Sequence, residues 1–210
     1  MPDIHESIAN CLATTGWYAG ESIFSFELCD RLVRRARLLA DTHELRSARV
    51  GRNVGVQANV QLRGDDTRWL AQAPVDESER DAVASVAGLQ AYLNEALFLS
   101  AQEVELHFAR YAPGAFYRTH RDRFRDDDAR LVSLVFYLND QWPEDAGGEL
   151  VLYADDDSGT VVARVQPRAG TMVCFRSDRF PHEVLPATRE RVSLTGWLRR
   201  AETAVHKISA

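Results

Sequence analysis

The segment that decides the fold runs from residue 131 to residue 175 and reads LVSLVFYLNDQWPEDAGGELVLYADDDSGTVVARVQPRAGTMVCF. Its short apolar runs are rich in valine and aromatic residues, and clusters of glycine, proline and aspartate separate them. Runs of this length are typical of strands, because most helices need more residues. We therefore interpret the segment as consecutive β-strands with no helices between them.

The same pattern continues on both sides of this segment. VELHFARY precedes it at residues 104–111, and RVSLTGWL follows it at residues 191–198. Short strands at this spacing predict an antiparallel sandwich or jelly roll. The expected fold class is α+β, mainly β, with a double-stranded β-helix core of about eight strands and supporting N-terminal helices.

The first hundred residues contain two helical patterns. Residues 26–45 place their apolar side chains on one helical face behind Ser25, a plausible N-cap, and residues 77–99 do the same. Residues 50–70 favour either a mobile lid or a plain edge hairpin, and they end near a turn-like RGDD at residues 63–66. We expect one domain over residues 1–210, with helical support and a lid or loop region in 1–100 and the β-helix core in 101–200.

Composition narrows the class of protein and its location. The 210 residues are 45% hydrophobic and 27% charged, which is typical of a soluble globular domain. A net charge of -6 argues against general nucleic-acid binding. There is no apolar run of roughly 18 residues that would span a membrane, and the N-terminal residues lack a signal-peptide pattern. Because Cys11, Cys29 and Cys174 have no CxxC spacing, we expect reduced thiols and a cytoplasmic protein.

One group of residues has the character of a metal site. His120 and Asp122 are two positions apart, so on a strand their side chains point to the same side. His182 lies in a short extended segment between two prolines, and Arg191 opens the last strand. Two imidazoles and one carboxylate bind Fe(II) on one face and leave positions open for a cosubstrate and dioxygen. Arg191 is suited to a carboxylate, and Thr195 shares its strand face.

Simpler interpretations of these residues stay open at this point. The HxD pair also suits a hydrogen-bonded surface pair, and the candidate aromatic and hydroxyl residues also suit ordinary strand packing. The remaining histidines are interpreted as structural or solvated: His5, His43, His107 and His206. Four arginines alternate around the metal motif and either steer an acidic partner or pair with the aspartates at 126–128: Arg118, Arg121, Arg123 and Arg125.

Between residues 62 and 198 the chain resembles a known family. RGDDTRW, YAPGAFYRTHRD, FYLND followed by tryptophan, AGGELVLY and FPHEVLPATRERVSLTGW occur in this order. These blocks resemble 2-oxoglutarate- and iron-dependent dioxygenases of prolyl 4-hydroxylase type, closest to the hypoxia-sensing prolyl hydroxylases of animals and their bacterial counterparts. The segment from Tyr111 to His120 is one residue shorter than in the animal enzymes.

The resemblance implies a role for each matching residue. The implied iron ligands are His120, Asp122 and His182. The implied 2-oxoglutarate-binding residues are Arg191, Tyr137, Thr195 and Tyr111. The implied substrate-side residues are Arg130, Trp197, Arg63 and Asp65. The cofactor is Fe(II), the cosubstrates are 2-oxoglutarate and O2, and the family often uses L-ascorbate, whose requirement here the sequence leaves open.

The resemblance also implies a reaction and a kind of partner. The expected reaction hydroxylates a prolyl residue at its 4-position in a protein or peptide and yields succinate and CO2. We expect a monomer that binds no membrane. Nucleic acid is disfavoured, because RVSLTGW has Ser193 and Trp197 where nucleic-acid dealkylases carry Asn and Arg. The alternatives are a non-catalytic cupin-like metal-binding sensor, or an oxygenase of the same chemistry that acts on a free amino acid or nucleic acid.

Overall fold

The computed structural model describes residues 3–48, 62–122, 129–156 and 158–201. The elements of the first hundred residues are α1 (Ile4–Thr14), β1 (Trp17–Glu21), α2 (Phe26–Asp41), β2 (Arg46–Ser47), β3 (Asp65–Trp69) and α3 (Glu77–Leu97). The later elements are β4 (Glu103–Tyr111), β5 (Tyr117–His120), β6 (Arg130–Tyr137), β7 (Leu150–Tyr153), β8 (Val161–Val165), β9 (Thr171–Arg176), β10 (His182–Val184) and β11 (Arg191–Arg199).

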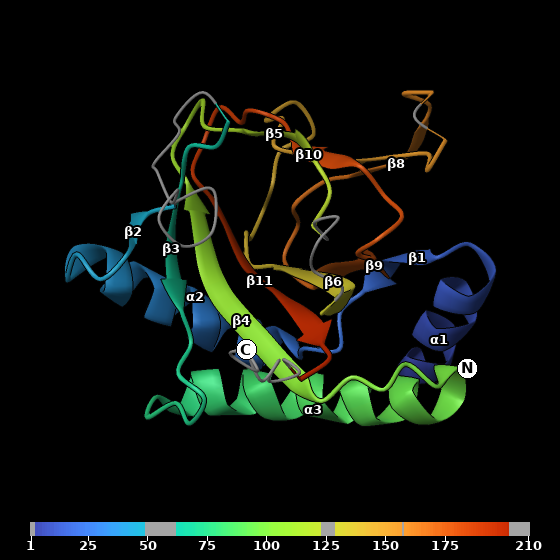
Figure 1. Cartoon of the computed structure of the whole chain (residues 1–210). Helices are drawn as coiled ribbons and strands as arrows, with labels where there is room; N and C mark the ends of the chain where they lie inside the picture. Colours follow the sequence, from blue (N-terminus) through green and yellow to red (C-terminus); the bar gives the residue numbers. More distant parts are fainter. Residues whose placement is uncertain (1–2, 49–61, 123–128, 157, 202–210) are drawn as a thin grey trace, which may run out of the picture.

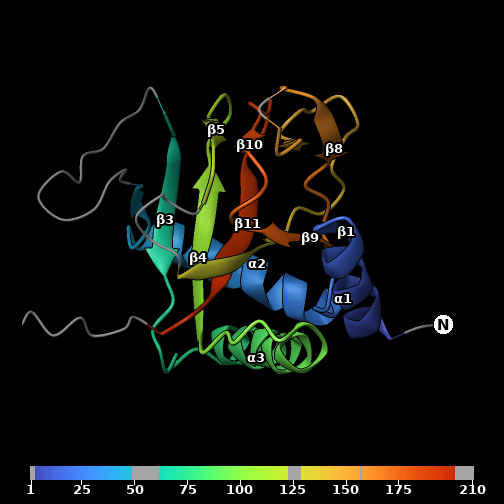
Figure 2. The ribbon, with the colours of Figure 1, turned by 45° about the vertical axis from the view of Figure 1, so that its right-hand side comes forward.

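Two antiparallel sheets form the core. The larger has the order β1-β9-β6-β11-β4-β3-β2, and the smaller has the order β5-β10-β7-β8. Figures 1 and 2 show the larger sheet lying between the helices on one side and the smaller sheet on the other. The eight strands from β4 to β11, split between two sheets, confirm the expected double-stranded β-helix.

Alternation along the strands of the larger sheet separates two apolar clusters. In β6, Val132, Leu134 and Phe136 pack with the three helices. The intervening Val135 and Tyr137 belong to a second cluster that lies between the two sheets. Because successive side chains of a strand point to opposite faces, one strand serves both layers. The inner face of the larger sheet therefore becomes one wall of any cavity between the sheets.

The helices agree with expectation in position and differ at their ends. Ser25 caps α2, and its side chain accepts a hydrogen bond from the Leu28 amide, as predicted. This helix ends at Asp41 rather than at residue 45, and α3 ends at Leu97 because Phe98 adopts a left-handed conformation with φ of 54°. Sequence analysis gave no boundaries for α1 or for strand β1, which pairs with β9 in the larger sheet.

The region expected as a lid or hairpin is described only at its flanks. Residues 49–61 lie outside the described residues, and on either side β2 and β3 pair antiparallel at the edge of the larger sheet. The interpretation of RGDD as a turn is wrong, because Asp65 and Asp66 begin strand β3. Arg63 donates two hydrogen bonds, of 2.7 and 2.6 Å, to the buried Asp65 carboxylate.

None of the described helices is long and apolar enough to cross a membrane.

Candidate metal and cosubstrate site

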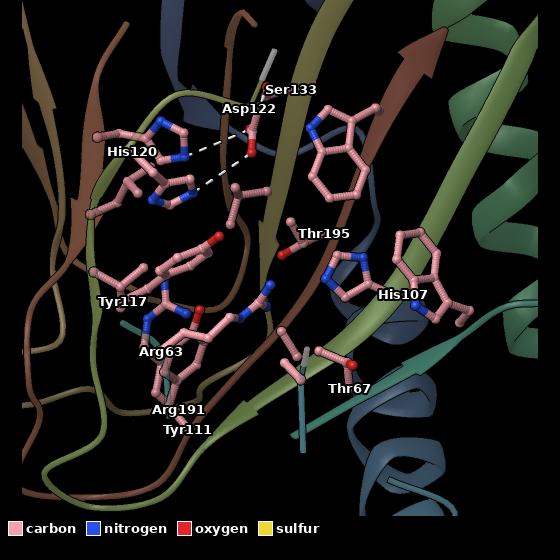
Figure 3. A pocket seen from close by; sticks show the side chains of 18 of the residues that line it. Arg63, Thr67, His107, Tyr111, Tyr117, His120, Asp122, Ser133, Arg191 and Thr195 are labelled. Carbon is pink, nitrogen blue, oxygen red and sulfur yellow. Dashed lines mark hydrogen bonds and ion pairs between the residues drawn. The ribbon is translucent and has the colours of Figure 1, made fainter. Parts of the chain in front are cut away.

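The predicted metal ligands meet at one end of the smaller sheet. His120 ends β5, His182 begins β10, and the two residues are register partners. Asp122 lies just beyond the end of β5, so the chain bend after the strand, rather than strand alternation alone, brings its carboxylate to the imidazoles. Its two oxygens lie 3.7 Å from His120 Nε2 and 3.6 Å from His182 Nε2, as Figure 3 shows with dashed lines.

Hydrogen bonds behind these residues orient them. His120 Nδ1 lies 2.8 Å from the carbonyl oxygen of Arg118, and His182 Nδ1 lies 3.1 Å from that of Phe180. Each Nδ1 is therefore the protonated nitrogen, which leaves each Nε2 lone pair directed at the shared point. Ser133 donates a 2.7 Å hydrogen bond to Asp122 Oδ2 and so restrains the carboxylate.

The charge states suit a cation at this point. Burial lowers the pKa of His120 to about 3, and His182 beside it acts in the same direction. Burial alone raises the pKa of Asp122, but His182, His120 and Arg130 outweigh it and bring the pKa to about 2. The site at neutral pH therefore presents a neutral His120 and a carboxylate. These ligand atoms lie within 4.8 Å of one another, a donor set that fits Fe(II).

Arg191 occupies the interior of the same cavity. It is 2% exposed, and its Nε donates a 3.0 Å hydrogen bond to the Gly148 carbonyl. Its guanidinium carbon lies 4.9 Å from the centre of the Tyr111 ring and 5.2 Å from that of Tyr137. Among the described residues no carboxylate forms an ion pair with it, so a buried positive charge faces the cavity and favours an anionic ligand.

The other predicted cosubstrate residues surround this guanidinium. Tyr137 is fully buried, and its hydroxyl has no hydrogen-bond partner within the described part of the chain. Burial raises its pKa to about 12, so the hydroxyl is a donor at neutral pH. Thr195 lines the cavity, and its hydroxyl lies 3.3 Å from that of Ser193, whose oxygen is 3.5 Å from Arg191 Nη1. Tyr111 on β4 is the register partner of Arg191 on β11.

The predicted substrate-side residues divide into two places. The Arg130 guanidinium lies 3.5 Å from the centre of the Trp197 ring on the side of the cavity nearest β6. Arg63, held by Asp65, instead lies 4.3 Å from the Tyr117 ring, and that ring stacks on His120 with centroids 3.6 Å apart. The Arg63–Asp65 pair therefore supports a metal ligand from behind.

One cavity of about 530 Å³ is lined by most of these residues, whereas Tyr137 and Asp65 lie outside its lining. Its wall also includes side chains that sequence reasoning missed or set aside: Thr67, Trp69, His107 and Tyr117. His107 is buried rather than solvated, at 4% exposure, and Figure 3 shows its ring beside Thr195. Strand alternation was a usable signal for it, because residues 107, 109 and 111 share one face of β4 and Tyr111 was already a candidate.

The four arginines around the metal motif are described only in part. Arg121 pairs with Asp155 at 2.7 Å, and Arg118 lies over the Phe116 ring. Arg123, Arg125 and the aspartates at 126–128 lie outside the described residues.

Comparisons with known proteins agree with this site. The profile of the 2OG-Fe(II) oxygenase superfamily matches residues 106–199, which include the three candidate metal ligands and Arg191. The crystal structure of a prolyl-4-hydroxylase from Pseudomonas putida superposes with a TM-score of 0.85 at 38% identity, covering 94% of this chain and 100% of that one. The chain belongs to the prolyl 4-hydroxylase family of 2-oxoglutarate- and Fe(II)-dependent oxygenases.

More distant members of this family show the same fold or shared sequence. A Trichoplax adhaerens prolyl hydroxylase, solved with a hypoxia-inducible factor peptide, has a TM-score of 0.78 at 24% identity and covers 93% of this chain and 89% of its own. Human Egl nine homolog 1 is 25% identical over 91% of this chain. The hypoxia-inducible factor prolyl hydroxylase of Caenorhabditis elegans is 38% identical over 33% of it. The chain spans 46% and 10% of the lengths of these two curated relatives.

Family membership implies Fe(II) and 2-oxoglutarate, and the residues fit both. His120, Asp122 and His182 provide a facial ligand set with free Nε2 atoms. The buried charge of Arg191 and the unpartnered Tyr137 hydroxyl provide what a buried carboxylate needs: a cation and a hydrogen-bond donor.

Proposed function

We propose that the protein is a dioxygenase that hydroxylates a prolyl residue at the 4-position in a protein or peptide. One observation carries this proposal: a His–Asp–His metal site and a buried arginine share one cavity with an aromatic wall. When bound, iron and 2-oxoglutarate activate dioxygen, so that one oxygen atom enters a C–H bond and the other enters succinate, with release of CO2.

The chain's own residues bind and orient these groups. His120, Asp122 and His182 hold the metal, and the carbonyl groups behind the histidines keep each Nε2 directed at it. Asp122 would supply a carboxylate ligand where a small residue would leave room for a halide, which favours hydroxylation over halogenation. These residues leave the remaining positions to the cosubstrate and dioxygen.

Arg191 is proposed to bind the C5 carboxylate of 2-oxoglutarate. Its Nε is already bonded to Gly148, so the guanidinium is held before the cosubstrate arrives. Tyr137 and Thr195 would donate hydrogen bonds to the same carboxylate, and Tyr111, opposite Arg191 in the β4–β11 register, would line the pocket near the metal. Pairing the buried charge with a carboxylate in a site without bulk water strengthens the interaction.

The substrate side is proposed to lie along Trp197 and Arg130. The Arg130 guanidinium lies over the Trp197 ring. Together they form a surface with an aromatic part and a positive charge, against which an uncharged prolyl ring of a peptide could pack. Arg63 and Asp65 are proposed to act from the other place, where Arg63 lies over the Tyr117 ring that stacks on His120. We also propose that the protein is a monomer in the cytoplasm.

The test is incubation of the iron-loaded protein with cell extract, 2-oxoglutarate and oxygen, followed by mass spectrometry. We expect peptides that gain one oxygen atom on proline, and no gain with Asp122→Ala or His182→Ala. A gain confined to free amino acids or to nucleobases contradicts the prolyl assignment. Metal binding without any 2-oxoglutarate turnover favours the cupin-like sensor instead.

A further inference from the structure

Three rings form a cluster at the mouth of the cavity, away from Arg191. We call Trp69, His107 and Trp197 the aromatic wing. Their strands, β3, β4 and β11, are neighbours in the larger sheet. The His107 ring centre lies 4.7 Å from that of Trp69 and 5.4 Å from that of Trp197, and the two indoles are 5.9 Å apart. Trp69 is 51% exposed, so the wing reaches from solvent to the interior of the cavity.

The wing contains polar atoms whose hydrogen bonds are not made. His107 Nδ1 and Trp197 Nε1 are buried and have no partner among the residues that the structure describes. A buried polar group without a partner costs about 1–3 kcal/mol, so such groups are uncommon unless a ligand completes them. Both side chains line the cavity. The aromatic wing is therefore a surface for a ligand that brings its own hydrogen-bonding groups.

The surroundings of His107 indicate which chemical group of a ligand would match it. Burial lowers its pKa to about 4; among nearby charges Asp65 opposes this, and Arg63 and Arg130 add to it. The ring is therefore neutral at physiological pH and has one N–H donor and one acceptor nitrogen. An uncharged amide matches that pair of functions, and the flanking indoles match an apolar ring. A peptide containing proline supplies both.

We propose that His107 is a specificity-determining residue that hydrogen-bonds a backbone amide of the substrate peptide next to the target prolyl ring. This inference rests on the proposed function. Thr195, opposite His107 in the β4–β11 register, lies between it and Arg191, so the residue is close enough to act on substrate without taking part in cosubstrate binding. Loss of one such hydrogen bond corresponds to about a tenfold change in affinity.

The test uses the iron-loaded enzyme and a pool of acetylated, amidated peptides with one central proline and randomised flanks. His107→Phe keeps a ring beside both indoles and removes both nitrogens. We expect the apparent KM for the peptides to rise about tenfold while the KM for 2-oxoglutarate changes by less than about twofold. His107→Asn and His107→Leu, which have nearly the same shape, form a second pair that differs in hydrogen bonding. The asparagine variant is expected to recover part of the peptide affinity.

The outcomes separate this inference from the proposed function. Equal peptide KM values for His107→Phe and the parent protein, or equal values for the Asn and Leu variants, overturn the role of His107 and leave prolyl hydroxylation standing. A parallel rise in the KM for 2-oxoglutarate overturns it too, because it indicates a general structural effect. No oxygen gain on proline with the parent protein overturns the proposed function and the inference together. His43→Asn, at an exposed position, controls for loss of a histidine.

Discussion

Ser133 and Tyr137 lie on the same face of β6 and have opposite hydrogen-bonding states. Ser133 Oγ is bonded to Asp122 and to Ser177, at 2.7 and 2.8 Å. The Tyr137 hydroxyl is buried and without a partner in the described residues. A satisfied buried group stabilises the fold, whereas an unsatisfied one costs free energy until a ligand arrives. The two residues therefore lead to different predictions.

Tyr137→Phe is expected to affect stability and cosubstrate binding in opposite directions. Removing the unpartnered hydroxyl leaves the unliganded protein as stable as before or up to about 1 kcal/mol more stable, and it weakens 2-oxoglutarate binding about tenfold. Thermal unfolding and calorimetric titration of the metal-loaded protein measure the two effects. Tyr153→Phe on β7, whose hydroxyl donates to Glu183, is the control for cosubstrate affinity. Equal cosubstrate affinity in both variants would contradict a role for the Tyr137 hydroxyl.

Ser133→Ala is expected to weaken metal binding while leaving the three ligands in place. The change removes the hydrogen bond that restrains Asp122, and losses of this kind reduce metal affinity by about 10- to 100-fold. Titration with Fe(II) under anaerobic conditions measures it. Ser158→Ala, in an exposed turn, is the control. Unchanged affinity in Ser133→Ala would show that Asp122 needs no such support.

Strand β11 determines how closely the central strands of the larger sheet approach. A Cβ atom on Gly196 would lie 1.9 Å from the carbonyl oxygen of Glu105 on β4, so only glycine allows the two backbones to pair there. The same strand carries Arg191, Thr195 and Trp197 on its inner face. Packing of β11 against β4 therefore places three cavity residues at once.

Gly196→Ala is expected to destabilise the protein by about 3 kcal/mol or more, because the backbone of β4 or β11 must shift. Gly88→Ala is the matched control, since a Cβ atom there meets nothing within 4 Å in the exposed face of α3. In a helix this change is expected to stabilise by about 0.5–1 kcal/mol. Denaturant unfolding of both variants measures the contrast, and equal stabilities would refute it.

For the molecule as a whole, the buried imidazoles make stability depend on pH. Burial lowers the pKa of His107 to about 4, below its ordinary value of 6.5. The unfolded chain therefore takes up a proton on this residue at a higher pH than the folded protein does. The stability that the neutral ring provides is present above pH 6.5 and is lost as the pH falls towards 4.

Lowering the pH from about 7 to about 5 is expected to cost about 2 kcal/mol of unfolding free energy through His107. The unfolding free energy of His107→Phe should fall less than that of the parent protein over the same pH interval, and the difference should be about 2 kcal/mol, because the phenyl ring takes up no proton. Urea unfolding at the two pH values, without metal, measures the difference. His43→Asn, at an exposed position, is the control for loss of a histidine. The same pH dependence in all three proteins would contradict burial of a neutral His107.

Local patterns were sufficient for the strands β4, β6, β7, β8, β9 and β11 and for helices α2 and α3, because apolar periodicity and turn residues act over a few positions. They were insufficient for β3. An RGDD sequence favours a turn by itself, whereas in the structure Asp65 and Asp66 begin a strand that pairs with β4. Local patterns also could not predict that β1 pairs with β9, since the two strands are far apart in the chain.

The sequence by itself determined the residue types and spacing of the metal motif, the alternation that directs Arg191 and Thr195 to one face, and hence the family. Which side chains share a face of a strand follows from their spacing along the chain, because successive side chains alternate between the two faces. Tertiary structure decided the bend that turns Asp122 towards both imidazoles and the place of His107 beside the indoles. It also decided that the Tyr137 hydroxyl has no partner among the described residues. These depend on which distant strands pack together, because burial and unmade hydrogen bonds exist only after the sheets have closed around the cavity.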